Sequence, residues 1–292
     1  IECCRKQFVR PLRDLPFEAQ QCANVLWALA VVGYSEDNKF VLECRTQLLH
    51  RLEEEGQHAL RGEHLRQLHQ YQTWVDLELC NTYHPPPHHG STCAVNKDGI
   101  SLPWGLANKC ARAMADTQED VHSSEFHAQV SRQLLNLSER LGCSLRGQVE
   151  EEKIVAEIGY AVDIAVPSLR LVIEVDGPSH FVISDKQDKF GRHYHWLNGQ
   201  SSFKRRQLEV VGWTVVSIPY FLYQPLKGHA QQLAFLSKHL GKFLLETHAD
   251  AATVRVKQED ERAVRVKQEP GLTASSMSAA NFASDELHPD HA

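Results

Sequence analysis

Two carboxylates lie at the end of an apolar segment in the second half of the chain. In residues 169–176, apolar positions alternate in the manner of a β-strand that is covered on its faces, and Glu174 and Asp176 close the run. Gly177 and Pro178 predict that the strand ends in a tight turn. A buried charge is costly unless a metal ion, a cation or a polar ligand compensates it. The alternative, two solvated acids on an exposed edge, is disfavoured by the Val and Ile content.

A third carboxylate lies on the strand predicted just before this one. Residues 160–166 alternate as a strand and contain Asp163, and Pro167-Ser168 predicts the turn of a β-hairpin. The hairpin would bring Asp163 close to Glu174 and Asp176. These three acids are the first candidates for a functional site.

The bulk composition is that of an ordinary globular protein. The chain has 292 residues, enough for two modest domains, with 42% hydrophobic and 23% charged residues. The formal net charge of -6 argues against a generally basic nucleic-acid coat, so any nucleic-acid site must be a local patch. No apolar run is long enough to cross a bilayer, and no membrane span is expected. Eight cysteines without a C-x-x-C pair favour a reducing compartment over a zinc ribbon or a disulfide framework.

The first 121 residues are expected to form two regions. Residues 1–80 contain three stretches with helical spacing and predict an α-helical, repeat-like segment, with a plain helical bundle as the alternative. Residues 81–121 are rich in Pro and Gly and predict an irregular linker. The chain begins at Ile1 without an initiator Met, which suggests the C-terminal portion of a longer protein whose targeting segment is not visible.

Residues 122–248 are predicted to form an α/β domain. A helix capped by Ser123 or Ser124 precedes the hairpin, and a polar loop over 184–202 follows it. A helix ending at Gly212 and a strand over 213–219 come next, and the strand–helix–strand order predicts a parallel crossover within one sheet. A final amphipathic helix would complete the domain.

Residues 249–292 are predicted to be a disordered tail because their composition cannot supply a core. A short duplication there places Lys257 and Lys267 in the apolar-Lys-x-Glu pattern of SUMO acceptor sites. That pattern opens a different function, a SUMO-modified nuclear or cytosolic interaction protein. Low-complexity duplication is the preferred interpretation.

The ordered motifs of the second half closely resemble the RAP domain. The carriers of the resemblance are Asp163-Ile-Ala, the run from Leu171 to Phe181, Lys204-Arg-Arg-Gln-Leu208, and the run from Gly212 to Tyr220. The segment from Asn24 to Tyr34 more loosely resembles helices that precede this domain in FAST-kinase-like and octatricopeptide-repeat proteins. The resemblance implies RNA binding in mitochondrial or chloroplast RNA processing, stability or translation, with other RNA-processing proteins as further partners.

RAP domains are also similar to restriction-endonuclease-like folds, a mixed sheet with flanking helices. That similarity implies a metal-dependent endoribonuclease as an alternative, in which Asp163 and Glu174, with Asp176, hold Mg²⁺ and His180 carries protons. Asp176 stands where such nucleases carry a lysine, which argues against catalysis. RNA binding alone would require no cofactor.

The expected RNA contacts follow the acidic strand. Cations would meet phosphates, and aromatic side chains such as Phe190, Tyr194 and Trp196 would stack on unpaired bases. The alternative places Trp196 in the core and the three consecutive cations on a solvated helix face. The predicted RNA-binding residues are Lys186, Lys189, Arg192, Tyr194, His195, Lys204, Arg205 and Arg206.

Overall fold

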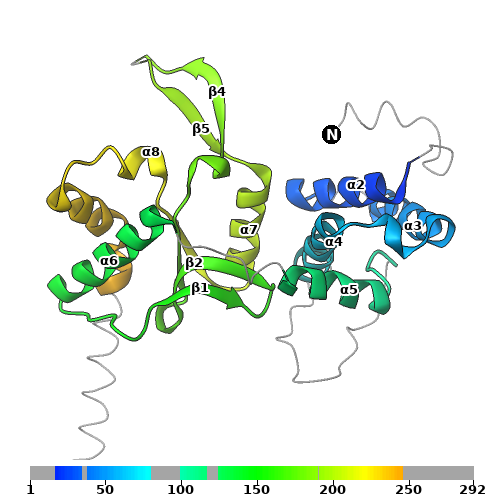
Figure 1. Cartoon of the computed structure of the whole chain (residues 1–292), viewed down its shortest axis with the longest axis horizontal. Coiled ribbons are helices and arrows are strands. Elements are labelled where there is room, and N and C mark those ends of the chain that lie inside the picture. Colours follow the sequence, from blue (N-terminus) through cyan, green and yellow to red (C-terminus); the bar gives the residue numbers. More distant parts are fainter. Residues whose placement is uncertain (1–16, 35–37, 80–98, 117–123, 190, 246–292) are drawn as a thin grey trace, which may run out of the picture. The chain divides into compact units, whose positions relative to one another are not determined.

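The computed structural model describes five stretches of the chain: residues 17–34, 38–79, 99–116, 124–189 and 191–245. The predicted disordered tail, with Lys257 and Lys267, lies outside them. Helices come first, and a mixed sheet with flanking helices follows (Figure 1). None of the described helices combines the length and the apolar character that a bilayer crossing requires.

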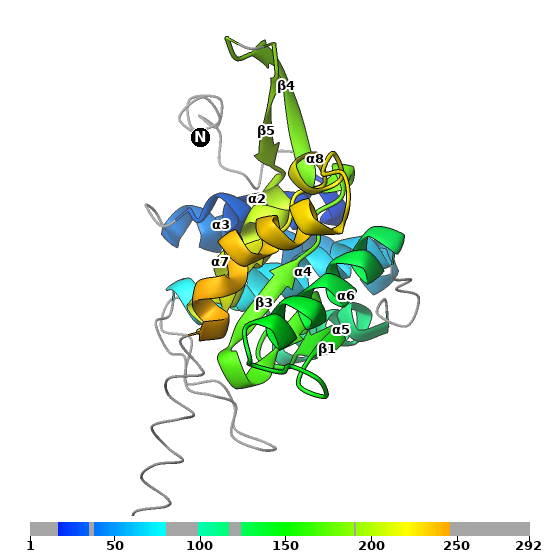
Figure 2. The same cartoon turned by 90° about the vertical axis from the view of Figure 1, so that its left-hand side faces the viewer.

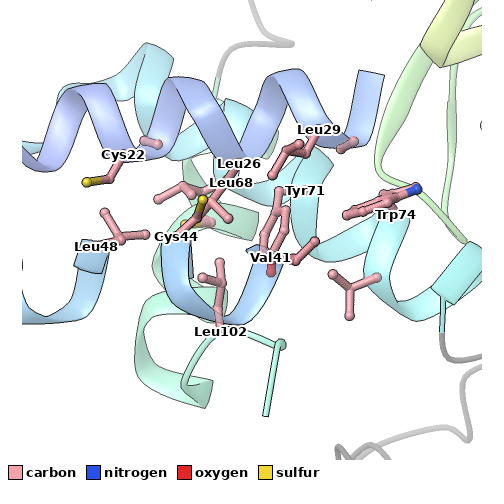
Figure 3. Close-up of a cluster of buried hydrophobic side chains, with 14 of the residues drawn as sticks. Cys22, Leu26, Leu29, Val41, Cys44, Leu48, Leu68, Tyr71, Trp74 and Leu102 are labelled. Carbon is pink, nitrogen blue, oxygen red and sulfur yellow. The ribbon is translucent and has the colours of Figure 1, made fainter. Parts of the chain in front are cut away.

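The three helices predicted in the first segment are present. They are α2 (Ala19–Val32), α3 (Asn38–Glu55) and α4 (Gly62–Trp74), and a π-helical turn, η3 (Val75–Leu79), follows α4. Gly33 ends α2 in the left-handed conformation, with φ of 63°, where a residue without a Cβ is favoured. Side chains such as Leu26, Leu68 and Trp74 form one buried cluster between the helices (Figure 3).

The predicted irregular linker over 81–121 is wrong for its second half. Residues Trp104–Ala115 form helix α5, which packs Leu106 and Cys110 into the same cluster. The Tyr71 hydroxyl donates to the Ile100 carbonyl at 2.6 Å and fixes the approach to α5. Pro103 reads as a helix breaker in the sequence, but it occupies the N-cap, where a missing N–H costs nothing.

The α/β domain is built on a four-stranded mixed sheet, as predicted. The strands lie in the order β1 (Glu150–Val155), β2 (Tyr160–Val166), β3 (Leu171–Glu174) and β6 (Thr214–Ser217). β1, β2 and β3 are antiparallel neighbours, and β6 runs parallel to β3. The predicted hairpin is therefore β2–β3, with its turn at η5 (Pro167–Leu169). The edge strand β1 was not predicted, because its run of Glu and Lys carries little apolar alternation.

Helices cover both faces of this sheet. Helix α6 (Glu125–Arg140) and the helix over 229–245 share one core cluster with alternate residues of β2 and β3, including Ile164 and Ile173. Helix α7 (Gly199–Val210), which connects toward β6, packs Leu208 against Val172 in the cluster on the other face. The Ser124 hydroxyl accepts from the His127 amide and caps α6, as predicted.

The predicted loop over 184–202 is mostly a β-hairpin and the first turn of α7. Strands β4 (Phe181–Gln187) and β5 (His193–Leu197) form their own two-stranded sheet, which extends away from the four-stranded sheet (Figures 1 and 2). Asp188 and Arg192 close the hairpin through backbone and side-chain hydrogen bonds. The many charged and polar residues concealed the strand pattern, because neither strand has a fully buried face.

Candidate functional site: an acidic centre and an aromatic hairpin

Three carboxylates lie in a row across the four-stranded sheet. In the β1–β2 register, Glu152 falls opposite Asp163, between the pairs Glu151–Ile164 and Lys153–Val162. Asp163 lies next to Ile164, the first β2 residue that pairs with β3. Its Oδ2 accepts a hydrogen bond from the Val175 amide at 2.6 Å. We call Glu152, Asp163, Glu174 and the following Asp176 the acidic centre.

Helix α7 supplies positive charge to this centre. The Lys204 ammonium donates to Glu174 Oε2 at 2.7 Å, and Arg205 Nη2 lies 3.4 Å from Asp176 Oδ2. The Ser217 hydroxyl on β6 also donates to Asp176. Like charges on neighbouring strands repel, so these partners are what make the row tolerable inside the fold.

Burial dominates the protonation of the centre. Glu174 and Asp176 are 5% and 2% exposed. Desolvation raises the pKa of Glu174 to about 7, although the neighbouring Lys204 acts in the opposite direction. Desolvation likewise raises the pKa of Asp176 and of Glu152, and the nearby charge of Asp163 adds to both shifts.

Glu152 is held in an unusual backbone conformation. Its φ is 49°, in the left-handed region that non-glycine residues rarely occupy. Its carboxylate lies 3.3 Å from Nδ1 of the buried His127 on α6. Strain of this kind concentrates at functional sites, so Glu152 and His127 extend the centre beyond the acids predicted from sequence.

His180 lies between the acidic centre and the β4–β5 hairpin. Its Nδ1 is 3.0 Å from the Ser201 hydroxyl and 3.4 Å from Asp176 Oδ1. Asn198, the N-cap of α7, donates through its backbone amide to the His180 carbonyl and through Nδ2 to the Ser179 carbonyl, each at 2.8 Å. A small pocket is lined by Glu174, Asp176, His180, Ser201, Lys204 and Arg205.

The two faces of the β4–β5 hairpin differ. On one face, Phe181 and His195 contact Phe221 of the short helix α8 (Tyr220–Tyr223), with the His195 ring stacked on Phe221 at 4.0 Å. The other face carries Val182, Tyr194 and Trp196, which are 57%, 46% and 63% exposed. Trp196 pairs with Val182 across the strands, and its ring lies within 20° of parallel to that of Tyr194. We call these three side chains the outer face of the hairpin.

Comparison with known proteins identifies the family of this region. Residues 173–239, from β3 into the last helix, match the model of the RAP domain. The chain carries a RAP domain. The RAP domain-containing protein, chloroplastic, of Oryza sativa subsp. japonica is 24% identical over 231 residues. That alignment covers 78% of this chain and 30% of the relative, so the chain spans less than a third of the relative's length.

The cations predicted to bind RNA fall into two groups in the RAP domain. Lys186, Lys189 and Arg192 are exposed on the hairpin, where Arg192 pairs with Asp188 at 2.8 Å. Lys204, Arg205 and Arg206 instead have carboxylate partners within the fold, and RNA contact by these three stays a prediction. Phe190 lies outside the described residues.

Arg206 joins the RAP domain to the helical segment. Its Nε donates to Glu78 on η3 at 3.0 Å, and its terminal nitrogens donate to the Ala30 and Val31 carbonyls at the end of α2. A cation is favoured at that helix end, where carbonyls lack partners. Its neighbour Phe203 is fully buried in the helical cluster.

The residues present do not fit a magnesium ion. Among the described residues, no three His, Cys, Asp or Glu side chains lie close enough together to hold a metal. The two predicted ligands have other partners: Asp163 accepts a backbone amide, and Glu174 accepts Lys204. In place of a lysine on the strand, Lys204 from α7 lies beside the acids and pairs with Glu174.

Several residues of the site were not predicted. Glu152, His127 and Ser217 come from elements whose packing the sequence does not specify. Lys204 was predicted as an RNA contact, but its pairing with Glu174 was not. A partial signal for that pairing existed, because an internal acid pair needs a nearby cation and α7 carries three in a row. Trp196 was predicted to stack on bases, but Val182, which the β4–β5 pairing brings beside it, was not predicted as part of the site.

Proposed function

We propose that this chain is an RNA-binding protein of organellar RNA metabolism that holds unpaired bases on its RAP domain. The observation that carries the proposal is the outer face of the hairpin. Large apolar side chains that are exposed together normally mark a contact surface. Here two of the three are aromatic, and they share a narrow, extended hairpin with cations.

Single-stranded RNA is the ligand that this combination fits best. Bases stack on aromatic rings without regard to sequence, and cations beside the rings meet the phosphates. Lys186, Lys189 and Arg192 supply that charge on a chain whose net charge is -6. The helical segment would add sequence selectivity if it continues as a repeat array, which the similarity to octatricopeptide-repeat and FAST-kinase-like proteins suggests.

The organelle is inferred from the family. The similarity of the chain to a chloroplastic RAP domain-containing protein supports a role in a chloroplast or a mitochondrion, in RNA processing, stability or translation. Other RNA-processing proteins would be natural partners there.

The test compares two exposed tryptophans. Trp196→Ala in the full chain should weaken binding of a fluorescent single-stranded RNA about tenfold, within the roughly 1–3 kcal/mol that one base–aromatic stack contributes. Trp104→Ala is the matched control, because Trp104 on α5 is 78% exposed and lies outside the hairpin. Equal affinity of the two variants would contradict the proposal, as would a preference for fully paired RNA.

A further inference from the structure

The pocket at the base of the hairpin contains a histidine in an arrangement suited to proton transfer. A carboxylate can only accept a hydrogen bond, so the Asp176 contact favours a hydrogen on Nδ1 of His180. The Ser201 hydroxyl can donate or accept, and it is compatible with that tautomer. Nε2 is then the basic nitrogen. The side chain is 37% exposed, which allows a ligand to reach it.

The pocket also holds a proton donor and fixed positive charge. Lys204 and Arg205 line it together with His180. The buried Glu174 beside Lys204 and the buried Asp176 beside Arg205 hold both cations in place. Fixed cations of this kind stabilise charge that develops on a phosphate.

RNA on the outer face of the hairpin would pass close to this pocket. Trp196 pairs with Val182, and His180 precedes Val182 by two residues, which is about 7 Å of extended chain. Asn198 ties the end of β5 to the carbonyls of Ser179 and His180. The nucleotide next to a base stacked on Trp196 is therefore within reach of His180.

We propose that the RAP domain cleaves single-stranded RNA without a metal ion, with His180 as the catalytic base. This inference rests on the proposed function, because the hairpin must first hold the RNA. It follows from the poor fit of the acidic centre to magnesium combined with a pocket that already contains a base and cations.

The reaction is an internal transesterification. His180 Nε2 takes the proton of a ribose 2′-hydroxyl, and the 2′ oxygen forms a bond to the adjacent phosphorus. The bond from phosphorus to the 5′ oxygen breaks, and that oxygen takes a proton from the Lys204 ammonium. The protonated His180 then releases its proton to solvent, and Lys204 regains a proton from solvent, so both residues return to their starting states. The products are a 2′,3′-cyclic phosphate and a 5′-hydroxyl, so no water, oxidant or metal is consumed. Asp176 and Ser201 are positioning residues.

The experiment incubates the full chain with end-labelled single-stranded RNA in excess EDTA. We expect cleavage that leaves 2′,3′-cyclic phosphate ends and that stops when the nucleotide at the cleavage site is replaced by its 2′-deoxy form. His180→Asn should lower the rate at least about 100-fold, the range for loss of a general base, while RNA affinity stays unchanged. His50→Asn, an exposed histidine on α3, is the matched control and should cleave as the parent does.

The other outcomes overturn the inference in distinguishable ways. RNA binding without cleavage would overturn it and leave the proposed function intact. Cleavage that requires Mg²⁺, yields 5′-phosphate ends and is lost in Asp163→Asn would replace it with a metal-dependent nuclease. Equal EDTA-resistant cleavage by the parent chain and by His180→Asn would show that the activity does not depend on this pocket, and loss of RNA binding in the parent chain would overturn both proposals.

Discussion

The acidic centre and the outer face of the hairpin differ in burial and in the partners of their side chains. In the centre, Glu174 and Asp176 are buried, and they pair with Lys204, Arg205 and Ser217. The outer face is exposed, and its rings contact mainly each other and solvent. We infer that the acidic centre stabilises the domain and shapes the pocket, and we propose that the hairpin contacts RNA.

The largest effect should come from unpairing the centre. Lys204→Met leaves the buried Glu174 without its cation, and we expect the free energy of unfolding to fall by about 3 kcal/mol at pH 8. Urea denaturation followed by circular dichroism measures it. Lys186→Met, an exposed lysine on β4, should change stability by less than about 0.5 kcal/mol. A loss as small as the control's would mean that the Lys204–Glu174 pair contributes little to stability.

Unfolding measured over a pH series would test how the ionisation of Glu174 affects stability. The pKa of Glu174 is about 7 in the folded chain and near 4.5 when unfolded, so the folded state binds this proton more tightly. The contribution of Glu174 to stability therefore falls as pH rises from about 4.5 to about 7. Relative to Glu174→Gln, the parent chain should lose on the order of 2 kcal/mol between pH 5 and pH 8. A relative gain over that range would show that Lys204 outweighs desolvation.

The smallest effect concerns charge on the hairpin. Lys186→Gln combined with Lys189→Gln should weaken RNA binding less than tenfold and leave the unfolding free energy unchanged. Each phosphate contact that is lost should reduce the slope of log affinity against log salt by about 0.7 for single-stranded RNA. Anisotropy titrations over a salt series measure the slope. An unchanged slope would remove these lysines from the interface.

The sequence predicted the scaffold of the centre but not its partners. Alternation in 160–166 and 169–176 defined β2 and β3, and the turn between them placed Asp163 near Glu174. The ion pairs to Lys204 and Arg205 depend on how α7 packs on the sheet, and no local pattern encodes that packing. Glu152 was missed for a related reason, because it lies on an acidic edge strand without apolar alternation.

For the β4–β5 hairpin, the sequence predicted the binding chemistry but not the strands. The residue types around 186–196 predicted RNA contact, but the strands themselves were read as a loop because apolar and polar residues do not alternate against a core. Strand pairing is what brings Val182 beside Trp196 and turns one face outward. Composition therefore indicated the chemistry, and only tertiary structure gave its arrangement.

RNA is proposed to lie on the outer face of the hairpin. The most direct measurement is photocrosslinking of the full chain to single-stranded RNA containing 4-thiouridine, followed by mass spectrometry of the linked peptides. We expect crosslinks at Tyr194 and Trp196, with weaker ones near His180. Crosslinks confined to the helices α2 to α5, with none on β4 or β5, would contradict the account.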